Sequence, residues 1–337
     1  MHHAHSEREA VSSTAGDVFA QQRGFLAGTS WWNASAREVI GVSGPDRLVW
    51  LHSLLTQDLL ALGPGVTTEA LVLTPQGKVE HSVLITDDGV TAWLLPEAGH
   101  TAPLLAWLSS MVFRMEVSIS TPEMRVWGYW GSQDSDFLLP DALEFVDPWP
   151  RVGEGSVGYH NATHPGSGWA LRYGVGPAFP LSASEHNRVS DEAIEALMIA
   201  AGRPGAADVD DKTLPHELDW LRTAVHLNKG CYRGQESVAK VHNLGHPPRR
   251  LTLLHVDGSL SLLPTPGDTV MKDDAALGVV TRAGWHHELG PVALALLKRM
   301  APEGEVTIAT SDGVVAANQE LLVPRDAGRA MPRRRLG

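Results

Sequence analysis

Cysteine is almost absent from this chain of 337 residues, which contains only Cys231. A single thiol excludes an intrachain disulfide bond, and it excludes any zinc or iron–sulfur site that needs several cysteines from this chain alone. Such cysteine usage is typical of a reducing compartment. There is also no run of about 18 apolar residues that would predict a membrane span, and the N-terminal residues lack the apolar core of a signal peptide. We therefore expect a cytoplasmic protein with no membrane partner.

Positive charge is scarce as well. The chain has 27 lysine and arginine residues against 39 aspartate and glutamate residues, and its formal net charge is −12. This balance argues against general binding to nucleic-acid phosphates or to anionic lipid. Hydrophobic residues make up 43% and charged residues 20% of the chain, as in soluble globular proteins. At this length we expect two or three domains.

The first two thirds of the chain alternate between short apolar runs and turn residues. The predicted order is a strand at 37–42, a helix from 45, strands at 69–74, 78–86 and 90–95, a helix at 97–110, and strands at 112–119, 124–131 and 168–175. A helix follows at 191–201, with Ser190 as its predicted N-cap. This order predicts an α+β body with antiparallel sheets and helices packed against them.

After residue 246 the pattern changes to short strands separated by glycine, aspartate and proline, which predicts a small antiparallel β-barrel or sandwich. The expected organisation is a loose leader at 1–28, an α+β body at 29–245 with subdomains at about 29–122 and 123–245, a C-terminal β-barrel at 246–326 and a basic tail at 327–337. The tail contains Arg333, Arg334 and Arg335, and a solvated terminus is its simplest interpretation.

The only thiol lies in the octamer KGCYRGQE, at 229–236. Two glycines shape a tight loop, and a helix is predicted to begin at Gln235. Backbone amides near that helix start, together with Lys229 and Arg233, would favour a thiolate at Cys231. The alternative is that Cys231 is a small buried hydrophobic residue with no chemical role.

The octamer resembles the K-G-C-[aromatic]-x-G-Q-E signature of the YgfZ-type folate-binding proteins, which are relatives of the glycine-cleavage T-protein, an aminomethyltransferase. The motif is long and therefore specific. The resemblance covers most of the chain, and the run that leads into the thiol is most similar to the actinobacterial branch. Further segments that resemble the family lie at 43–59, 71–85, 197–218 and 277–299.

The resemblance implies a composite α+β body with a C-terminal barrel, a central channel for tetrahydrofolate or another reduced folate, and a role in making or repairing iron–sulfur clusters. Its partners would be the folate and iron–sulfur client proteins or assembly factors. The family's cysteine corresponds to Cys231. Its supporting motif residues correspond to Lys229, Gly230, Tyr232, Arg233, Gly234, Gln235 and Glu236.

Folate contacts are less clearly marked. Tyr232 could form a wall for a planar ligand, although packing in the core explains it equally. Arg249 and Arg250 could bind the glutamyl tail, and the alternative is that they are ordinary surface arginines. Ala200 stands where the family often has a glutamate that contacts the pterin, and a methyl group cannot accept the pterin's hydrogen bonds. The sequence therefore predicts a changed, weakened or lost pterin contact at this position.

Two other functions remain open. One is a tetrahydrofolate-dependent aminomethyl- or methyltransferase of the T-protein type, which needs a carboxylate in the pocket, and no aspartate matches it with confidence. The other is a binding module with an inert cysteine. No metal site is predicted, because neither His216-Glu217 nor the run from His286 to Glu288 has the H-E-x-x-H spacing.

Overall fold

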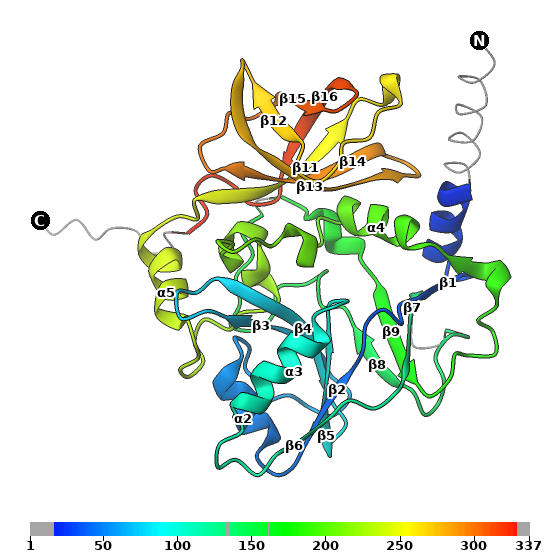
Figure 1. Ribbon diagram of the computed structural model, residues 1–337, viewed down its shortest axis with the longest axis vertical. Coiled ribbons are helices and arrows are strands. Elements are labelled where there is room, and N and C mark those ends of the chain that lie inside the picture. The colour runs from blue at the N-terminus through cyan, green and yellow to red at the C-terminus, as the bar shows by residue number, and fades with distance from the viewer. Residues whose placement is uncertain (1–16, 132–134, 161, 329–337) are drawn as a thin grey trace, which may run out of the picture.

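The computed structural model describes residues 17–131, 135–160 and 162–328 (Figure 1). It contains two five-stranded sheets, one closed six-stranded barrel and several helices packed between and around them. The predicted α+β class with a C-terminal antiparallel barrel is confirmed.

The first sheet has the strand order β3-β4-β5-β2-β6, and its adjacent strands are antiparallel. Helices α2 and α3 cover one face, where Trp50, Leu51, Leu104 and Leu108 pack on the sheet. The strands are β2 (Ile40–Ser43), β3 (Thr67–Leu73), β4 (Val79–Asp87), β5 (Thr91–Pro96) and β6 (Ser118–Ser120), and the helices are α2 (Arg47–Leu54) and α3 (Thr101–Ser110).

The second sheet has the order β10-β1-β7-β9-β8, and only the β1–β10 pair is parallel. Its strands are β1 (Trp31–Asn33), β7 (Arg125–Trp130), β8 (Leu143–Val146), β9 (Leu171–Gly176) and β10 (Arg188–Val189). The sequence reading missed β1, β8 and β10, because strands of two to four residues are too short to show a periodicity. Strand β1 belongs to this sheet although it precedes the first sheet in the chain.

The barrel lies at the top of Figure 1 and closes in the order β11-β14-β13-β12-β15-β16. Its strands are β11 (Arg249–Val256), β12 (Thr269–Lys272), β13 (Ala275–His286), β14 (Gly290–Lys298), β15 (Glu305–Thr310) and β16 (Gly313–Leu321). Helix α4 (Asp191–Ala200) lies beneath it, where Ala196 packs against Gly284 of β13. The predicted cap of α4 is confirmed, since Ser190 Oγ accepts a hydrogen bond from the amide of Ala193 at 3.3 Å. Helix α5 (Gln235–Leu244) lies at the edge of the molecule.

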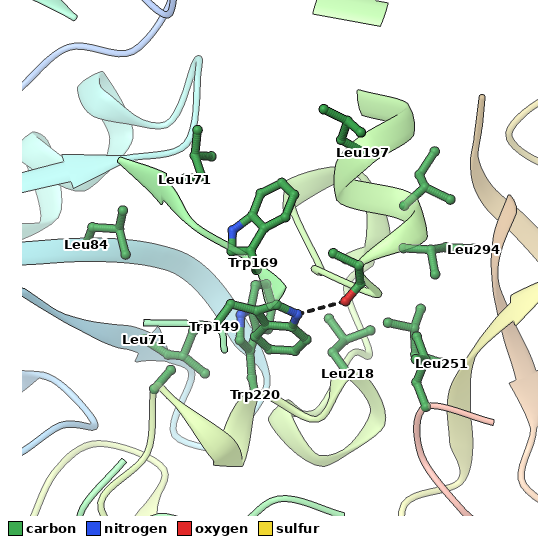
Figure 2. Packing of buried hydrophobic residues seen from close by; sticks show 14 of the residues in the cluster. Leu71, Leu84, Trp149, Trp169, Leu171, Leu197, Leu218, Trp220, Leu251 and Leu294 are labelled. Carbon is green, nitrogen blue, oxygen red and sulfur yellow. Dashed lines mark hydrogen bonds between the residues drawn. The ribbon is translucent and has the colours of Figure 1, made fainter. Parts of the chain in front are cut away.

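A single apolar cluster joins the two sheets, α4 and the barrel, as Figure 2 shows. Trp149, Trp169 and Trp220 form its centre. The indole of Trp149 donates a hydrogen bond to the backbone oxygen of Ala201 at 2.9 Å. Because this cluster joins side chains of both sheets, α4 and the barrel, it holds these elements in one fixed arrangement.

Three local expectations need correction. Residues 17–26 are helical rather than loose, because Phe25 is fully buried and the side chain of Gln22 bonds the barrel at Trp285 and His287; residues 1–16 lie outside the described part. The strand predicted at 112–119 is reduced to β6, because residues before it form turns around Phe113, which has a φ of 44°. Of the predicted tail, Ala327 is buried, while 329–337, with its arginines, lies outside the described residues.

Candidate functional site

The thiol of Cys231 is exposed to solvent on a loop that precedes α5. Gly230 beside it is exposed as well, whereas the flanking Lys229 and Tyr232 are each only 7% exposed. The loop therefore presents the sulfur outward while its neighbours point into the protein. This arrangement differs from that of a buried, packing cysteine.

Lys229 anchors the loop to the end of α2 through its ammonium group. Its ammonium group donates hydrogen bonds to the backbone oxygens of Leu55 at 2.6 Å and Gln57 at 2.9 Å, and to that of His52. These carbonyls lie at and just beyond the C-terminal end of α2, where the helix has no amide donors of its own to offer. Burial lowers the pKa of Lys229 to about 8. The expectation that this lysine holds the charge of a Cys231 thiolate is therefore corrected.

Arg233 is also engaged by other residues of the protein. Its guanidinium group forms an ion pair with Glu80 of β4 at 3.2 Å and lies 6.0 Å from the ring centre of Trp107 in α3. Both basic residues of the motif thus attach the loop to the first sheet and its helices. Their role in the structure is to position the loop.

Gly234 makes a third attachment, to the turn between β3 and β4. It has a φ of 85°, and a Cβ atom here would lie 2.6 Å from the backbone oxygen of Thr74 and 2.9 Å from Cα of Gly77. Only glycine allows this backbone approach without displacing the turn. The sequence predicted that Gly234 shapes the loop. In the structure, glycine is needed there because its backbone contacts the β3–β4 turn.

The remaining motif residues have separate roles. Tyr232 is buried, with its ring 5.3 Å from the Lys229 ammonium, so it packs inside the loop and is not exposed as a wall for a ligand. Burial raises its pKa. Gln235 donates to the backbone oxygen of Lys229 at 3.3 Å and closes the loop on itself. Glu236 is exposed in the first turn of α5.

His52 is a neighbour of the loop that the sequence reading missed. Its Nε2 lies 3.7 Å from the position that a Cβ atom would take at Gly230, the residue before the thiol. Its Nδ1 lies 3.1 Å from Asp58 Oδ1 and accepts a hydrogen bond from the amide of Leu59 at 3.3 Å. Burial and the charge of Lys229 lower the pKa of His52. A lone histidine in a predicted helix carries no signal that would have identified it.

Arg249 and Arg250, which were expected to bind a glutamyl tail, are both bound to other groups of the protein. Arg249 forms ion pairs with Asp210 at 2.6 Å and with Glu217 at 2.9 Å. Arg250 is fully buried and donates to the backbone oxygen of Ala301 at 3.1 Å. Both lie at the start of β11 and stabilise the junction between the barrel and the body. This expectation is corrected, because neither guanidinium is available to a ligand.

Two adjoining cavities lie between α4, β5 and the second sheet. The first, of about 220 Å³, is lined by Arg37, Glu97, Asp147, Tyr173, Arg203 and Arg282, among others. The second, of about 390 Å³, has mainly apolar walls that include Trp32, Ile194 and Met198. They share five lining residues, so they form one branched recess. Sequence reasoning identified none of these residues, because they come from segments far apart in the chain.

Ion pairs hold the polar wall of the recess in place. Arg37 binds Glu97 at 2.7 Å, and Arg282 binds Glu195 at 3.2 Å and Asp208 at 2.7 Å. Burial would raise the pKa of Glu97, but the neighbouring guanidinium groups, Arg37 foremost, hold it below the usual range. Glu97 is therefore ionised at neutral pH.

A second set of ion pairs closes the inner end of the recess. Arg203 binds Asp147 at 3.0 Å and Glu69 at 2.8 Å, and all three side chains are buried. The indole of Trp169 adds a hydrogen bond to Asp147 at 2.9 Å. This network separates the recess from a larger cleft of about 660 Å³, which is also lined by Asp147. The carboxylates of Asp147 and Glu69 are therefore already bound by donors of the protein.

The recess contains the acceptor groups and aromatic walls that a pterin ring would need. Glu97 binds Arg37 through Oε2 and Glu195 binds Arg282 through Oε1, so each retains an oxygen that can accept from a pterin. Tyr173 and Trp32 supply aromatic walls. Ala200 is not among the residues that line either cavity. The recess is thus formed without the side chain at position 200.

The described residues contain neither a cluster of metal-ligating side chains nor a helix that could span a membrane. No group of three or more histidine, cysteine, aspartate or glutamate side chains there is arranged to hold a metal ion. His216 is buried and its Nε2 bonds the backbone oxygen of Val238 at 3.1 Å. No helix in the described ranges is long and apolar enough to cross a membrane.

No protein-family model matches the chain. The mouse protein "Iron-sulfur cluster assembly factor IBA57, mitochondrial" is 26% identical over 336 residues, covering 91% of this chain and 90% of that protein. An aminomethyltransferase from Nostoc sp. is 25% identical over 298 residues, covering 78% of this chain and 76% of that enzyme. The crystal structure of glycine cleavage system aminomethyltransferase T from Bartonella henselae superimposes with a TM-score of 0.71 at 19% identity, covering 93% of this chain and 90% of that one. The chain therefore has the aminomethyltransferase fold, and iron–sulfur cluster assembly factors are among its relatives.

Proposed function

We propose that this protein is a folate-binding accessory factor for the assembly or repair of iron–sulfur clusters, and that Cys231 is its reacting group. The observation that carries the proposal is the exposed sulfur on a loop attached to the body by Lys229, Arg233 and Gly234. A loop held at three points presents the thiol to another molecule at little cost in conformational entropy. The iron–sulfur assembly factors among the relatives support the same function.

The chemistry proposed for Cys231 is ligand exchange at iron. The thiol releases its proton to solvent, and the thiolate gives a lone pair to an iron atom in place of another ligand. The reverse exchange returns the cluster to its recipient, and no electrons are transferred in either step. Because one sulfur cannot hold a cluster, the remaining ligands come from a partner protein or a small thiol. Iron–sulfur assembly factors or client proteins are therefore the expected partners.

Reduced folate is the proposed ligand of the recess. Glu97 and Glu195 would accept from the pterin, Tyr173 would pack against it, and the closed inner end would keep water from that edge. When bound, tetrahydrofolate supplies a one-carbon carrier. Binding is testable on the isolated protein by anaerobic calorimetry, and a lack of heat at millimolar tetrahydrofolate would remove folate from the proposal.

The cluster role is tested in cells that lack the gene. The wild-type protein should restore the activity of cluster-dependent enzymes, and Cys231→Ser should not. Ser237→Ala, in the first turns of the same helix, is the matched control and should restore activity. Full rescue by Cys231→Ser, at the same protein level as wild type, would refute the role of the thiol.

A tetrahydrofolate-dependent aminomethyl- or methyltransferase is the second candidate. The Nostoc relative and the shared fold favour it, and ionised Glu97 places a carboxylate in the recess. Transfer of an aminomethyl group to tetrahydrofolate by the purified protein, lost in Glu97→Gln but retained in Cys231→Ser, would favour this candidate over the first.

A further inference from the structure

The recess offers no free positive charge to a ligand. Three arginines and five carboxylates line the two cavities. Each of these arginines, Arg37, Arg203 and Arg282, is ion-paired with at least one carboxylate. A folate tail carries one α-carboxylate for each glutamate and a further γ-carboxylate at its end, and it needs cations to bind these charges. Arg203 Nη1 and Arg282 Nε are buried without a hydrogen-bond partner, but each guanidinium is already ion-paired with two carboxylates. Among the described residues that line the recess, no arginine or lysine therefore carries a positive charge that is not already paired.

The outer branch of the recess ends at an acidic rim. Asp191 and Glu192 line this branch and are exposed in the first turn of α4. The Nε1 of Trp32, on the opposite side, donates to Asp191 at 2.6 Å and fixes that carboxylate at the opening. A polyanionic tail that leaves through this branch would pass two negative charges at close range.

The N-terminus of α4 does not offset the repulsion between such a tail and the acidic rim. A helix N-terminus attracts anions through its free amides and its dipole. Here Ser190 already accepts from the amide of Ala193, and Asp191 and Glu192 already complement the dipole. The positive end of α4 is therefore satisfied by the protein's own residues.

We propose that the recess selects a reduced pterin or a folate with one glutamate over a folate with a long polyglutamate tail. The inference rests on the folate part of the proposed function and concerns the same recess. Each added glutamate brings another negative charge toward a rim that is acidic, so affinity should fall as the tail lengthens. The effect should weaken with added salt, because the rim is exposed.

The test is calorimetry under anaerobic conditions with three ligands: 6-methyltetrahydropterin, tetrahydrofolate with one glutamate and tetrahydrofolate with five. The expected result at low salt is that the pentaglutamate binds at least about threefold more weakly than the monoglutamate, with a smaller difference at high salt. The tail-less pterin should bind within about threefold of the monoglutamate, because the tail makes no favourable contact.

Two variants separate the rim from the charge of the whole protein. Glu192→Lys should raise the affinity for the pentaglutamate by about three- to tenfold and change that for the pterin little. Glu123→Lys is the matched control: it makes the same charge change at an exposed residue that lines neither cavity, and should leave the preference unaltered.

The possible results distinguish selection against long tails from folate binding itself. Equal or tighter binding of the pentaglutamate by the wild-type protein would overturn the inference and leave folate binding intact. If Glu192→Lys and Glu123→Lys change the affinity for the pentaglutamate equally, the role of the acidic rim is overturned. Absence of binding by all three ligands would overturn folate binding and the inference together, while the role of Cys231 would still depend on the cell experiment.

Discussion

The ammonium group of Lys229 lies 2.6 Å from the backbone oxygen of Leu55, the residue that caps the C-terminal end of α2. The two residues are 174 positions apart, so this bond fastens the thiol loop to a distant part of the chain. It gives the lysine of the motif a structural partner that the motif itself does not reveal. The same contact places Gly230 beside His52 and directs Cys231 outward.

Replacing Lys229 by methionine should destabilise the protein. The apolar side chain would leave the oxygens of Leu55 and Gln57 buried without a donor, at a cost of about 2–3 kcal/mol in the free energy of unfolding. Urea denaturation measures this loss. Lys240→Met, at an exposed position of α5, is the control and should change stability by less than about 0.5 kcal/mol. Equal effects of the two substitutions would contradict the anchoring role of Lys229.

Replacing Gly234 by alanine should also destabilise the protein, by about 2 kcal/mol or more, because the new Cβ would meet the backbone of the β3–β4 turn. Gly65→Ala is the control. Gly65 has a similar φ of 75° but open space around its Cβ position, so it reports the cost of the backbone conformation alone. Thermal unfolding of both variants separates the cost of the backbone conformation from the cost of the contact with the turn. A Gly234→Ala variant no less stable than Gly65→Ala would show that the close approach to the turn does not matter.

The exposure of Cys231 predicts rapid alkylation of the folded protein. Since the chain has no other cysteine, the incorporation of iodoacetamide followed by mass spectrometry reports this residue alone. The native rate should lie within about tenfold of the rate in urea, because no burial protects the sulfur. Protection of a hundredfold or more would place the thiol inside the protein and remove the basis of the proposed ligand exchange.

Asp219 predicts a pH dependence of stability. Its carboxylate is buried, one oxygen accepts from the amide of Tyr159 at 2.9 Å, and burial raises its pKa to about 7. In the unfolded chain the pKa is about 3.9, so the folded state binds more protons between these values. The contribution of Asp219 is therefore favourable at pH 4 and is lost as the pH rises through 7.

Asp219→Asn removes this titration and suits the φ of 55° at this position. The variant also loses the ion pair of Asp219 with Arg222 at 3.6 Å, a cost that does not vary with pH. We therefore expect the stability of the variant relative to wild type to rise by about 1–3 kcal/mol between pH 5 and pH 8. Urea denaturation at both pH values measures the difference. The control is Asp211→Asn, at an exposed position, which should behave alike at the two pH values. A constant difference for Asp219→Asn would mean that the carboxyl does not titrate in this range.

Much of the local structure could be predicted from the sequence. The three strands of the first meander, the cap at Ser190 and the strands of the barrel follow from alternation and turn residues that act over a few positions. The prediction failed where a contact outside the segment decides the outcome. Residues 17–26 form a helix because Gln22 and Phe25 pack against the rest of the protein, and no local pattern indicates that contact.

The sequence by itself determined that one thiol exists, that glycines flank it in a tight loop and that a helix follows, because these are properties of neighbouring residues. Only the tertiary structure decided which way each side chain of the loop points. It turned Lys229 and Arg233 toward the body and Cys231 toward solvent, buried Arg250 in the barrel, and gathered Glu97, Glu195 and Tyr173 around one recess. The physical reason is that packing and ion pairing join residues far apart in the chain, and their partners cannot be read from local pattern.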